Sequence, residues 1–275
     1  MKFYLKTKDH SVTHEYFDLL LDQELDMLVT NPQPVDLKKY YESQEYISHT
    51  DANNSFFDKV YQQVKRINLN RKLKLVGQHS TAKKLLDVGA GTGDFLVVAK
   101  SQGWTVIGVE PNVKAKQKAA EKGIGLNGSL EELEGDNFDV ITLWHVLEHL
   151  PNLNDQITRL NNLLAENGTL IIAVPNYKSF DANYYKNYWA AFDVPRHLWH
   201  FSKTSIFKLF QKENLEVVKI HPMIFDAFYV SLLSEKYKTG KQNFLRAFFI
   251  GLRSNIKAWS TKEYSSLIYV LKRAK

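Results

Sequence analysis

The chain has 275 residues, 44% of them hydrophobic and 24% charged, so it is long enough to bury a sizeable core and has the composition of an ordinary globular protein. The absence of cysteine excludes a disulfide framework, a thiolate metal site and a thiol nucleophile. The N-terminus shows no signal peptide and no apolar run reaches the roughly 18 residues of a membrane span, so we expect a cytoplasmic protein.

The predicted elements begin with a polar, aromatic extension over residues 1–55 and an amphipathic helix over residues 56–76. Strands and helices then alternate as they do in a parallel sheet. Strands are predicted at 84–88, 104–109, 124–127, 138–143, 169–174, 215–220 and 266–271, and helices at 94–102, 112–122, 153–166 and 205–214. Two further apolar runs within residues 222–262 predict a helical insertion that forms a lid or a second packing layer.

The segment Asp87–Asp94, DVGAGTGD, lies where the first predicted strand of the alternating region becomes a helix. Glycines there let the backbone approach a ligand closely. Asp94 stands where a dinucleotide-binding loop needs a small residue, and Asp87 would repel a pyrophosphate but can accept from an ammonium group. The next strand ends in Glu110 and Pro111, and a carboxylate at that place suits a ribose diol. Together these features predict a nucleoside cofactor that carries an amino acid instead of phosphates.

These two motifs, followed by Asn137–Leu150 and Gly168–Asn176, resemble the class I S-adenosylmethionine-dependent methyltransferases over residues 83–180. The resemblance implies a seven-stranded, Rossmann-like, doubly wound α/β sheet, mostly parallel with an antiparallel last strand, plus helical additions. It also implies S-adenosyl-L-methionine as cofactor and S-adenosyl-L-homocysteine as product. The implied cofactor-binding residues are Asp87, Gly89, Ala90, Gly91, Thr92, Gly93, Glu110, Pro111, Asn127, Ser129, Leu130, Trp144 and His145. We expect the amides of Gly89, Ala90 and Gly91 to face the methionine end.

Methyl transfer to a hydroxyl needs a base, and the candidate catalytic residues are His145, His149, His197 and His200. The H-x-x-E-H pattern at residues 145–149 is similar to the E-x-x-E-H pattern of ubiquinone-pathway O-methyltransferases, which is associated with a divalent ion. Here an imidazole replaces the first acid, which weakens the case for magnesium. We therefore predict no metal, and expect Glu148 and His149 to bond to the backbone at a helix start.

Residues 176–202 are dense in Tyr, Trp and His and lack periodicity, as expected of a loop that packs its rings on a ligand. Within it, residues 193–202 resemble the D-x-P-R-H-x-x-H-F-[ST] signature of a loosely characterised bacterial methyltransferase group. The predicted substrate residues are Tyr188, Trp189, Arg196 and Trp199, suited to an anionic or sugar-like acceptor. Pure packing is the alternative interpretation of this segment.

The N-terminal extension resembles a small zinc-ribbon-like module that precedes the methyltransferase in a bacterial subfamily. Asp22 and Asp26 stand about where that module has paired cysteines, so we expect a degenerate module without zinc. This divides the chain into the extension, residues 1–55, and a methyltransferase domain, residues 56–275, which carries the insertion at about 222–262.

The predicted function is methyl transfer to a small molecule, most simply to a hydroxyl of a sugar, quinone-like or lipid-linked acceptor. Residues 236–275 hold ten Lys or Arg and one acid, Glu263, and account for the net charge of +6. This basic tail leaves open a peripheral membrane contact, ordinary solvated lysines, or an RNA methyltransferase. The absence of an N-P-P-Y-like motif beside Trp144 argues against methylation of nucleic-acid amino groups. A non-catalytic cofactor-binding protein is a further alternative.

Overall fold

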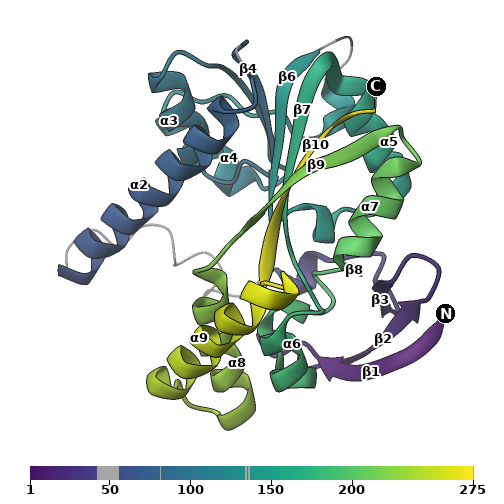
Figure 1. The fold of residues 1–275 in the computed structure, drawn as a ribbon. Helices are drawn as coiled ribbons and strands as arrows, with labels where there is room; N and C mark the ends of the chain where they lie inside the picture. The colour runs from purple at the N-terminus through teal and green to yellow at the C-terminus, as the bar shows by residue number, and fades with distance from the viewer. Residues whose placement is uncertain (42–55, 81, 134, 136, 275) are drawn as a thin grey trace.

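The computed structural model describes residues 1–41, 56–80, 82–133, 135 and 137–274, and its main body is a six-stranded sheet in the order β5-β4-β6-β7-β10-β9 (Figure 1). Four neighbouring strands are parallel: β5 (Thr105–Val109), β4 (Lys84–Val88), β6 (Phe138–Trp144) and β7 (Leu164–Pro175). The last strand, β10 (Ser266–Arg273), is antiparallel both to β7 and to β9 (Leu215–Pro222). It covers the range 266–271 that the sequence predicts as the closing strand.

Helices cover both faces of this sheet. Successive residues of a strand point to opposite faces, and the central strands are apolar on both. Leu85 and Val140 pack in one cluster with the helices α2 (Phe56–Gly77), α3 (Asp94–Ser101) and α4 (Val113–Glu121). Leu86 and Ile141 pack in another with α5 (Leu153–Leu163) and α7 (Lys203–Gln211). These helices lie where the sequence predicts helices. The side chains of residues 56–65, which suggested the amphipathic pattern of α2, lie outside the described residues.

The predicted strand at 124–127 is wrong, and over the described residues the main sheet has six strands where seven were expected. Among the described residues, a single parallel bridge, between Val109 and Asn127, extends the sheet beyond β5. The segment is rich in glycine, with Gly123, Gly125 and Gly128 around this bridge, and glycine disfavours a regular strand. Residues 130–132 then form the short 3₁₀ helix η2 (Leu130–Glu132).

A second, antiparallel sheet is built mainly from the N-terminal segment. It contains β1 (Lys2–Lys8), β2 (Tyr16–Asp22), β3 (Met27–Asn31) and β8 (Trp199–His200) in that order. The outer strand β8 comes from the aromatic loop, so a distant part of the chain completes this sheet. Asp22 accepts a hydrogen bond from the backbone N–H of Leu25 in the β2–β3 turn, where the resemblance placed a lost zinc ligand.

The N-terminal sheet, the aromatic loop and the helical insertion share one core. Phe17 and Leu28 of the sheet pack in one cluster with Trp189 of the loop and with Val230 and Ile250 of the insertion. The remaining elements of this part are η1 (Lys38–Tyr40), α6 (Phe180–Tyr185), η4 (Lys186–Tyr188), η5 (Ala190–Phe192), α8 (Asp226–Thr239) and α9 (Phe244–Thr261). Over the described residues, no helix combines the length and the apolar character needed to cross a bilayer.

Candidate functional site

The glycine loop lies between β4 and α3, at the carboxyl edge of three adjacent parallel strands. Gly89, Gly91 and Gly93 all have positive φ, at 70°, 54° and 75°, so the loop needs residues that tolerate the left-handed region. A Cβ on Gly89 would lie 2.4 Å from Cγ2 of Val146, whereas one on Gly91 would meet nothing within 4 Å. Gly89 therefore allows close packing against the segment after β6, and the backbone at Gly91 borders open space.

The expectation that three loop amides face the ligand is wrong. The N–H groups of Gly89 and Ala90 both donate to the carbonyl oxygen of Val109, at 2.8 and 2.9 Å. The N–H of Gly91 donates to Oε2 of Glu110 at 2.9 Å. The loop turns back over the end of β5, so these N–H groups are bonded within the protein. The loop therefore contributes to the site through its shape and by positioning Glu110.

Glu110 follows β5, where a ribose-binding carboxylate was predicted. Its Oε2 accepts from Gly91 and its Oε1 accepts from the backbone N–H of Asn112 at 2.8 Å. A carboxylate oxygen has two lone pairs, so one backbone donor per oxygen leaves capacity for a diol. The backbone of Asn127 lies beside that of Glu110, since the N–H of Glu110 donates to the carbonyl of Asn127 at 2.9 Å.

Of the other predicted cofactor residues, some lie near the candidate site and one lies in the core. Pro111 follows Glu110, and Ser129 precedes η2 without a side-chain capping bond. Leu130 is buried in the core on the α5 side of the sheet. The hydroxyl of Thr92 donates to the carboxylate of Asp94 at 2.8 Å, which secures the start of α3.

Asp87 is buried at the end of β4, and a lysine that the sequence analysis missed lies close to it. Burial raises the pKa of the Asp87 carboxyl to about 7, opposed by a 2.6 Å hydrogen bond from the Thr142 hydroxyl and by the charge of Lys72. Lys72, on α2, has its Nζ 4.5 Å from the centroid of the Trp144 ring, and burial lowers its pKa. Asp87 and Lys72 thus offer one acidic and one basic group at the same edge.

His145 follows β6 with a φ of 57° and is held between two carboxylates. Its Nδ1 lies 3.4 Å from Oε1 of Glu148, and its Nε2 lies 3.2 Å from Oδ2 of Asp226 at the start of α8. Burial alone would lower the pKa of His145, but the two carboxylates raise it to about 10. His145 is therefore an imidazolium at neutral pH and cannot accept a proton as a base.

His149 is a neutral histidine with one ring nitrogen fixed on the backbone. Its Nδ1 lies 3.0 Å from the carbonyl oxygen of Arg196 and therefore carries the hydrogen, which leaves Nε2 with a lone pair. Burial, followed by the charge of His197, lowers its pKa to about 4, so the ring is neutral at pH 7. His149 bonds to the backbone as expected, but it does so from the end of the 3₁₀ helix η3 (Leu147–His149) to a distant segment and not at a helix start.

Glu148, His149 and His197 each offer a ligand atom within 4.8 Å of the other two. Nδ1 of His197 is bonded to the carbonyl oxygen of Ala191 at 2.9 Å. Nε2 is therefore the ring nitrogen of His197 that could bind a metal ion. Oε1 of the buried Glu148 lies 3.4 Å from Nδ1 of His145, and its Oε2 has no hydrogen-bond partner among the described residues. Two imidazoles and one carboxylate suit a borderline transition metal better than magnesium. The predicted absence of a metal remains a prediction.

His200 is buried in β8 and its Nε2 lies 3.0 Å from Oγ1 of Thr30, whose hydroxyl donates to the carbonyl of His197. Burial holds the pKa of His200 well below its usual value. Its role in the structure is to join β8 to β3.

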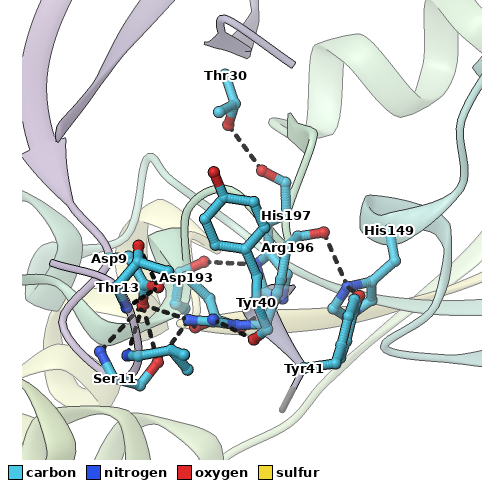
Figure 2. A network of polar contacts seen from close by, with 12 residues as sticks. Asp9, Ser11, Thr13, Thr30, Tyr40, Tyr41, His149, Asp193, Arg196 and His197 are labelled. Atoms are coloured by element: carbon cyan, nitrogen blue, oxygen red, sulfur yellow. Dashed lines mark hydrogen bonds and ion pairs between the residues drawn. The ribbon is translucent and has the colours of Figure 1, made fainter. Parts of the chain in front are cut away.

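Arg196 does not present its guanidinium to a ligand, contrary to the sequence-based expectation. The side chain is 3% exposed, and Figure 2 shows it at the centre of a polar network. It bonds to Asp9 and Asp193 at 3.0 and 2.6 Å, to the hydroxyl of Ser11 at 2.6 Å and to the carbonyl of Tyr40 at 2.8 Å. Arg196 therefore ties the aromatic loop to the N-terminal segment.

The aromatic residues predicted to contact the substrate also have protein partners. The indole N–H of the buried Trp189 donates to Asp181 at 2.7 Å, and that of the half-buried Trp199 donates to the carbonyl of Leu150 at 2.8 Å. Tyr188 is half-buried beside His10, with ring centroids 5.6 Å apart. The packing interpretation of this loop is thus correct for Trp189, whose ring lies in the second core.

The fold is that of a Rossmann-like α/β protein, with a candidate site at the carboxyl edge of its parallel strands. A family model described as "Methyltransferase domain" matches residues 61–220, more than half of the chain. The chain therefore belongs to the methyltransferase domain family and is a methyltransferase.

Individual proteins resemble it more distantly. A ubiquinone biosynthesis O-methyltransferase of Rickettsia felis is 25% identical over 206 residues, which cover 69% of this chain and 84% of the relative. A protein of the same name from Pasteurella multocida is 31% identical over 115 residues, covering 35% and 48% of the two chains.

Solved structures share the fold. The magnesium protoporphyrin IX methyltransferase of Synechocystis, crystallised with S-adenosylhomocysteine, aligns with a TM-score of 0.57 at 15% identity and covers 86% of this chain and 98% of its own. Geranyl diphosphate C-methyltransferase of Streptomyces coelicolor aligns with a TM-score of 0.57 at 14% identity and covers 82% and 86%.

Proposed function

We propose that this protein transfers the methyl group of S-adenosylmethionine to a hydroxyl oxygen of a small molecule, with a phenolic, quinone-like acceptor favoured. The observation that carries the proposal is the neutral imidazole of His149, whose Nδ1–H is fixed on the carbonyl of Arg196. An oxygen acceptor must lose a proton during transfer, and this ring can receive it. The similarity to the O-methyltransferase of Rickettsia felis supports the same acceptor class.

The residues at the carboxyl edge fit S-adenosylmethionine. Its amino-acid end carries an ammonium and a carboxylate, which match the carboxylate of Asp87 and the ammonium of Lys72. Its ribose diol matches Glu110, and the open space at Gly91 leaves room beside the backbone. No phosphate is present in this cofactor, in agreement with loop amides that are bonded within the protein.

The chain's own residues then have separate tasks. When bound, S-adenosylmethionine supplies a methyl carbon activated by the adjacent sulfonium. Asp87, Lys72 and Glu110 orient the cofactor, because alignment of the reacting atoms lowers the barrier to such a displacement. As the acceptor oxygen bonds to the methyl carbon and the carbon–sulfur bond breaks, Nε2 of His149 takes the hydroxyl proton. The charged His145 holds Glu148 and Asp226 beside the site and takes no proton.

The acceptor class is tested by incubating the full chain with methyl-labelled S-adenosylmethionine and separate pools of catechol-like phenols, sugars and total RNA. We expect label in an ether of the phenolic pool. Label in RNA alone would contradict the proposal and support the RNA alternative. Cofactor binding without label in any pool would support the non-catalytic alternative.

A further inference from the structure

The outermost helix of the insertion, α9, has a buried face made of small residues. This face packs on α8 and α6, and its members are Ala247, Ile250, Gly251, Ser254, Asn255 and Ala258. At Gly251, a Cβ would lie 3.0 Å from the carbonyl oxygen of Ala227, so the two helices are in close contact. Figure 1 shows α8 and α9 side by side at one end of the molecule. Tight packing on one side fixes which residues α9 turns outward.

The outward side of α9 is apolar and aromatic. Its large exposed apolar residues are Phe244, Leu245, Phe248, Phe249, Leu252, Ile256 and Trp259. At 3.6 residues per turn these positions span an arc of roughly 140°, with the buried Asn255 near one edge of it. Leu245 is 76% exposed, Phe249 is 62% exposed and Trp259 is 66% exposed. Such a contiguous apolar surface marks an interaction site.

A basic stripe runs beside this apolar arc. Arg246, Arg253 and Lys257 lie between the apolar arc and the buried face, within roughly 40° of one another on the helix. Residues 226–262 contain seven Lys or Arg and two acids. Of the acids, the buried Glu235 lies 3.4 Å from Nε of Arg246, and Asp226 bonds to His145. The outward surface of the hairpin therefore combines apolar side chains with positive charge.

We propose that the α8–α9 hairpin is a membrane-docking surface that lays α9 in the interface of an anionic lipid bilayer. An in-plane helix of this kind inserts its Trp, Phe and Leu side chains at the headgroup boundary while Lys and Arg contact anionic headgroups. A second copy of the chain fits less well, because the acids of its hairpin already face Arg246 and His145 of their own chain and an antiparallel two-fold contact would bring the basic stripes of both copies together. Nucleic acid would pair with the basic stripe but leave the apolar arc in water.

The start of the hairpin also touches the candidate active site. Asp226 begins α8 and bonds to His145 after β6. Phe225, just before it, lies under the guanidinium of Arg71 of α2, 5.8 Å from the ring centroid. A docked hairpin would thus hold the cofactor edge near the lipid, where amphiphilic acceptors reside. The docking itself does not depend on the proposed acceptor.

The test is flotation of the full chain with phosphatidylcholine vesicles, with and without phosphatidylglycerol. We expect binding to the anionic vesicles that weakens as salt is raised. The double substitution Phe249→Ser and Trp259→Ser should reduce this binding by at least about tenfold. Lys257→Gln should weaken it less and reduce its salt dependence. Phe3→Ser is the matched control, because Phe3 is an exposed aromatic residue on β1.

Retained secondary structure and thermal midpoint of each variant show that it folds. Equal binding of the double variant and the parent, or no binding of the parent to anionic vesicles, would overturn the proposal. A dimer in light scattering that the double variant loses, without any vesicle binding, would assign the surface to a second copy instead.

Discussion

Nε2 of His145 lies 3.2 Å from Oδ2 of Asp226, and this contact joins the end of a central sheet strand to the start of the helical insertion. His145 adopts a φ of 57°, which is uncommon for a residue with a side chain. The contact holds α8 against the carboxyl edge of β6. It therefore couples the candidate active site to the hairpin that we propose docks on a membrane.

The first prediction concerns the pH dependence of this contact. The pKa of His145 is about 10 in the folded protein, against an ordinary value of 6.5. Protonation therefore favours the folded state, so its stabilising effect is complete below about pH 6.5 and is lost as the pH rises towards 10. Asp226→Asn should lower the pKa of His145 and flatten this loss. NMR titration of the ring and urea unfolding across this range measure both effects. An unchanged pKa would contradict the assignment.

A second prediction separates cofactor binding from stability at Asp87. Burial raises the pKa of its carboxyl to about 7 from 3.8. The folded state therefore disfavours ionisation of Asp87, and the free energy of unfolding falls as the pH rises from about 3.8 to about 7. Asp87→Asn should therefore increase the free energy of unfolding at pH 8. The substitution should also weaken the binding of S-adenosylhomocysteine by about tenfold to a hundredfold, since it removes a charged hydrogen-bond acceptor. Calorimetry and urea unfolding provide the two readouts. Loss of stability with unchanged affinity would mean that Asp87 is structural only.

A third prediction assigns the proton acceptor. His149→Asn keeps a donor that can reach the Arg196 carbonyl but removes the Nε2 lone pair. We expect kcat to fall by about 10²-fold or more, with little change in the Kd for S-adenosylhomocysteine. His200→Asn is the comparison, because His200 is buried against Thr30 and should affect stability more than the transfer step. A larger loss of kcat in the His200 variant would reverse the assignment.

A fourth prediction concerns the Arg196 network. Arg196→Met should cost about 3–5 kcal/mol of stability, because it leaves the buried Asp9 carboxylate without its cation. Adding Asp9→Asn should restore part of this loss. Arg196 also holds the pKa of Asp9 well below its usual range, so the parent should lose stability in acid as these carboxylates protonate. A stable Arg196→Met protein with only a raised KM would instead support the substrate role expected from the sequence.

The sequence predicted the site best where strand order alone places residues. Asp87 lies at the end of β4, and Glu110 and His145 follow β5 and β6, which pair with β4 on either side. The three strands are parallel, so their carboxyl ends meet at one edge. Lys72 was missed because nothing in a helical pattern shows which lysine points at a distant sheet edge. Asp226 was missed because the position of the insertion depends on packing between parts far apart in sequence.

The aromatic loop shows a different limit. Arg196, Trp189 and His200 have the composition of a ligand pocket, but the structure uses them to join the loop to the N-terminal sheet and to α6. A buried network and a binding pocket need the same residue types, because both must pair polar groups away from water. The pairing of β8 with β3 decided between them, and a two-residue strand gives no periodic signal in a sequence.

The most direct test of the central claim is isothermal titration of the full chain with S-adenosylhomocysteine, alongside NAD and the Glu110→Ala variant. We predict saturable one-to-one binding of S-adenosylhomocysteine and no binding of NAD. Loss of the ribose acceptor should weaken the affinity of the Glu110→Ala variant by about tenfold or more. Binding of NAD without S-adenosylhomocysteine, or equal affinity of variant and parent, would contradict the account.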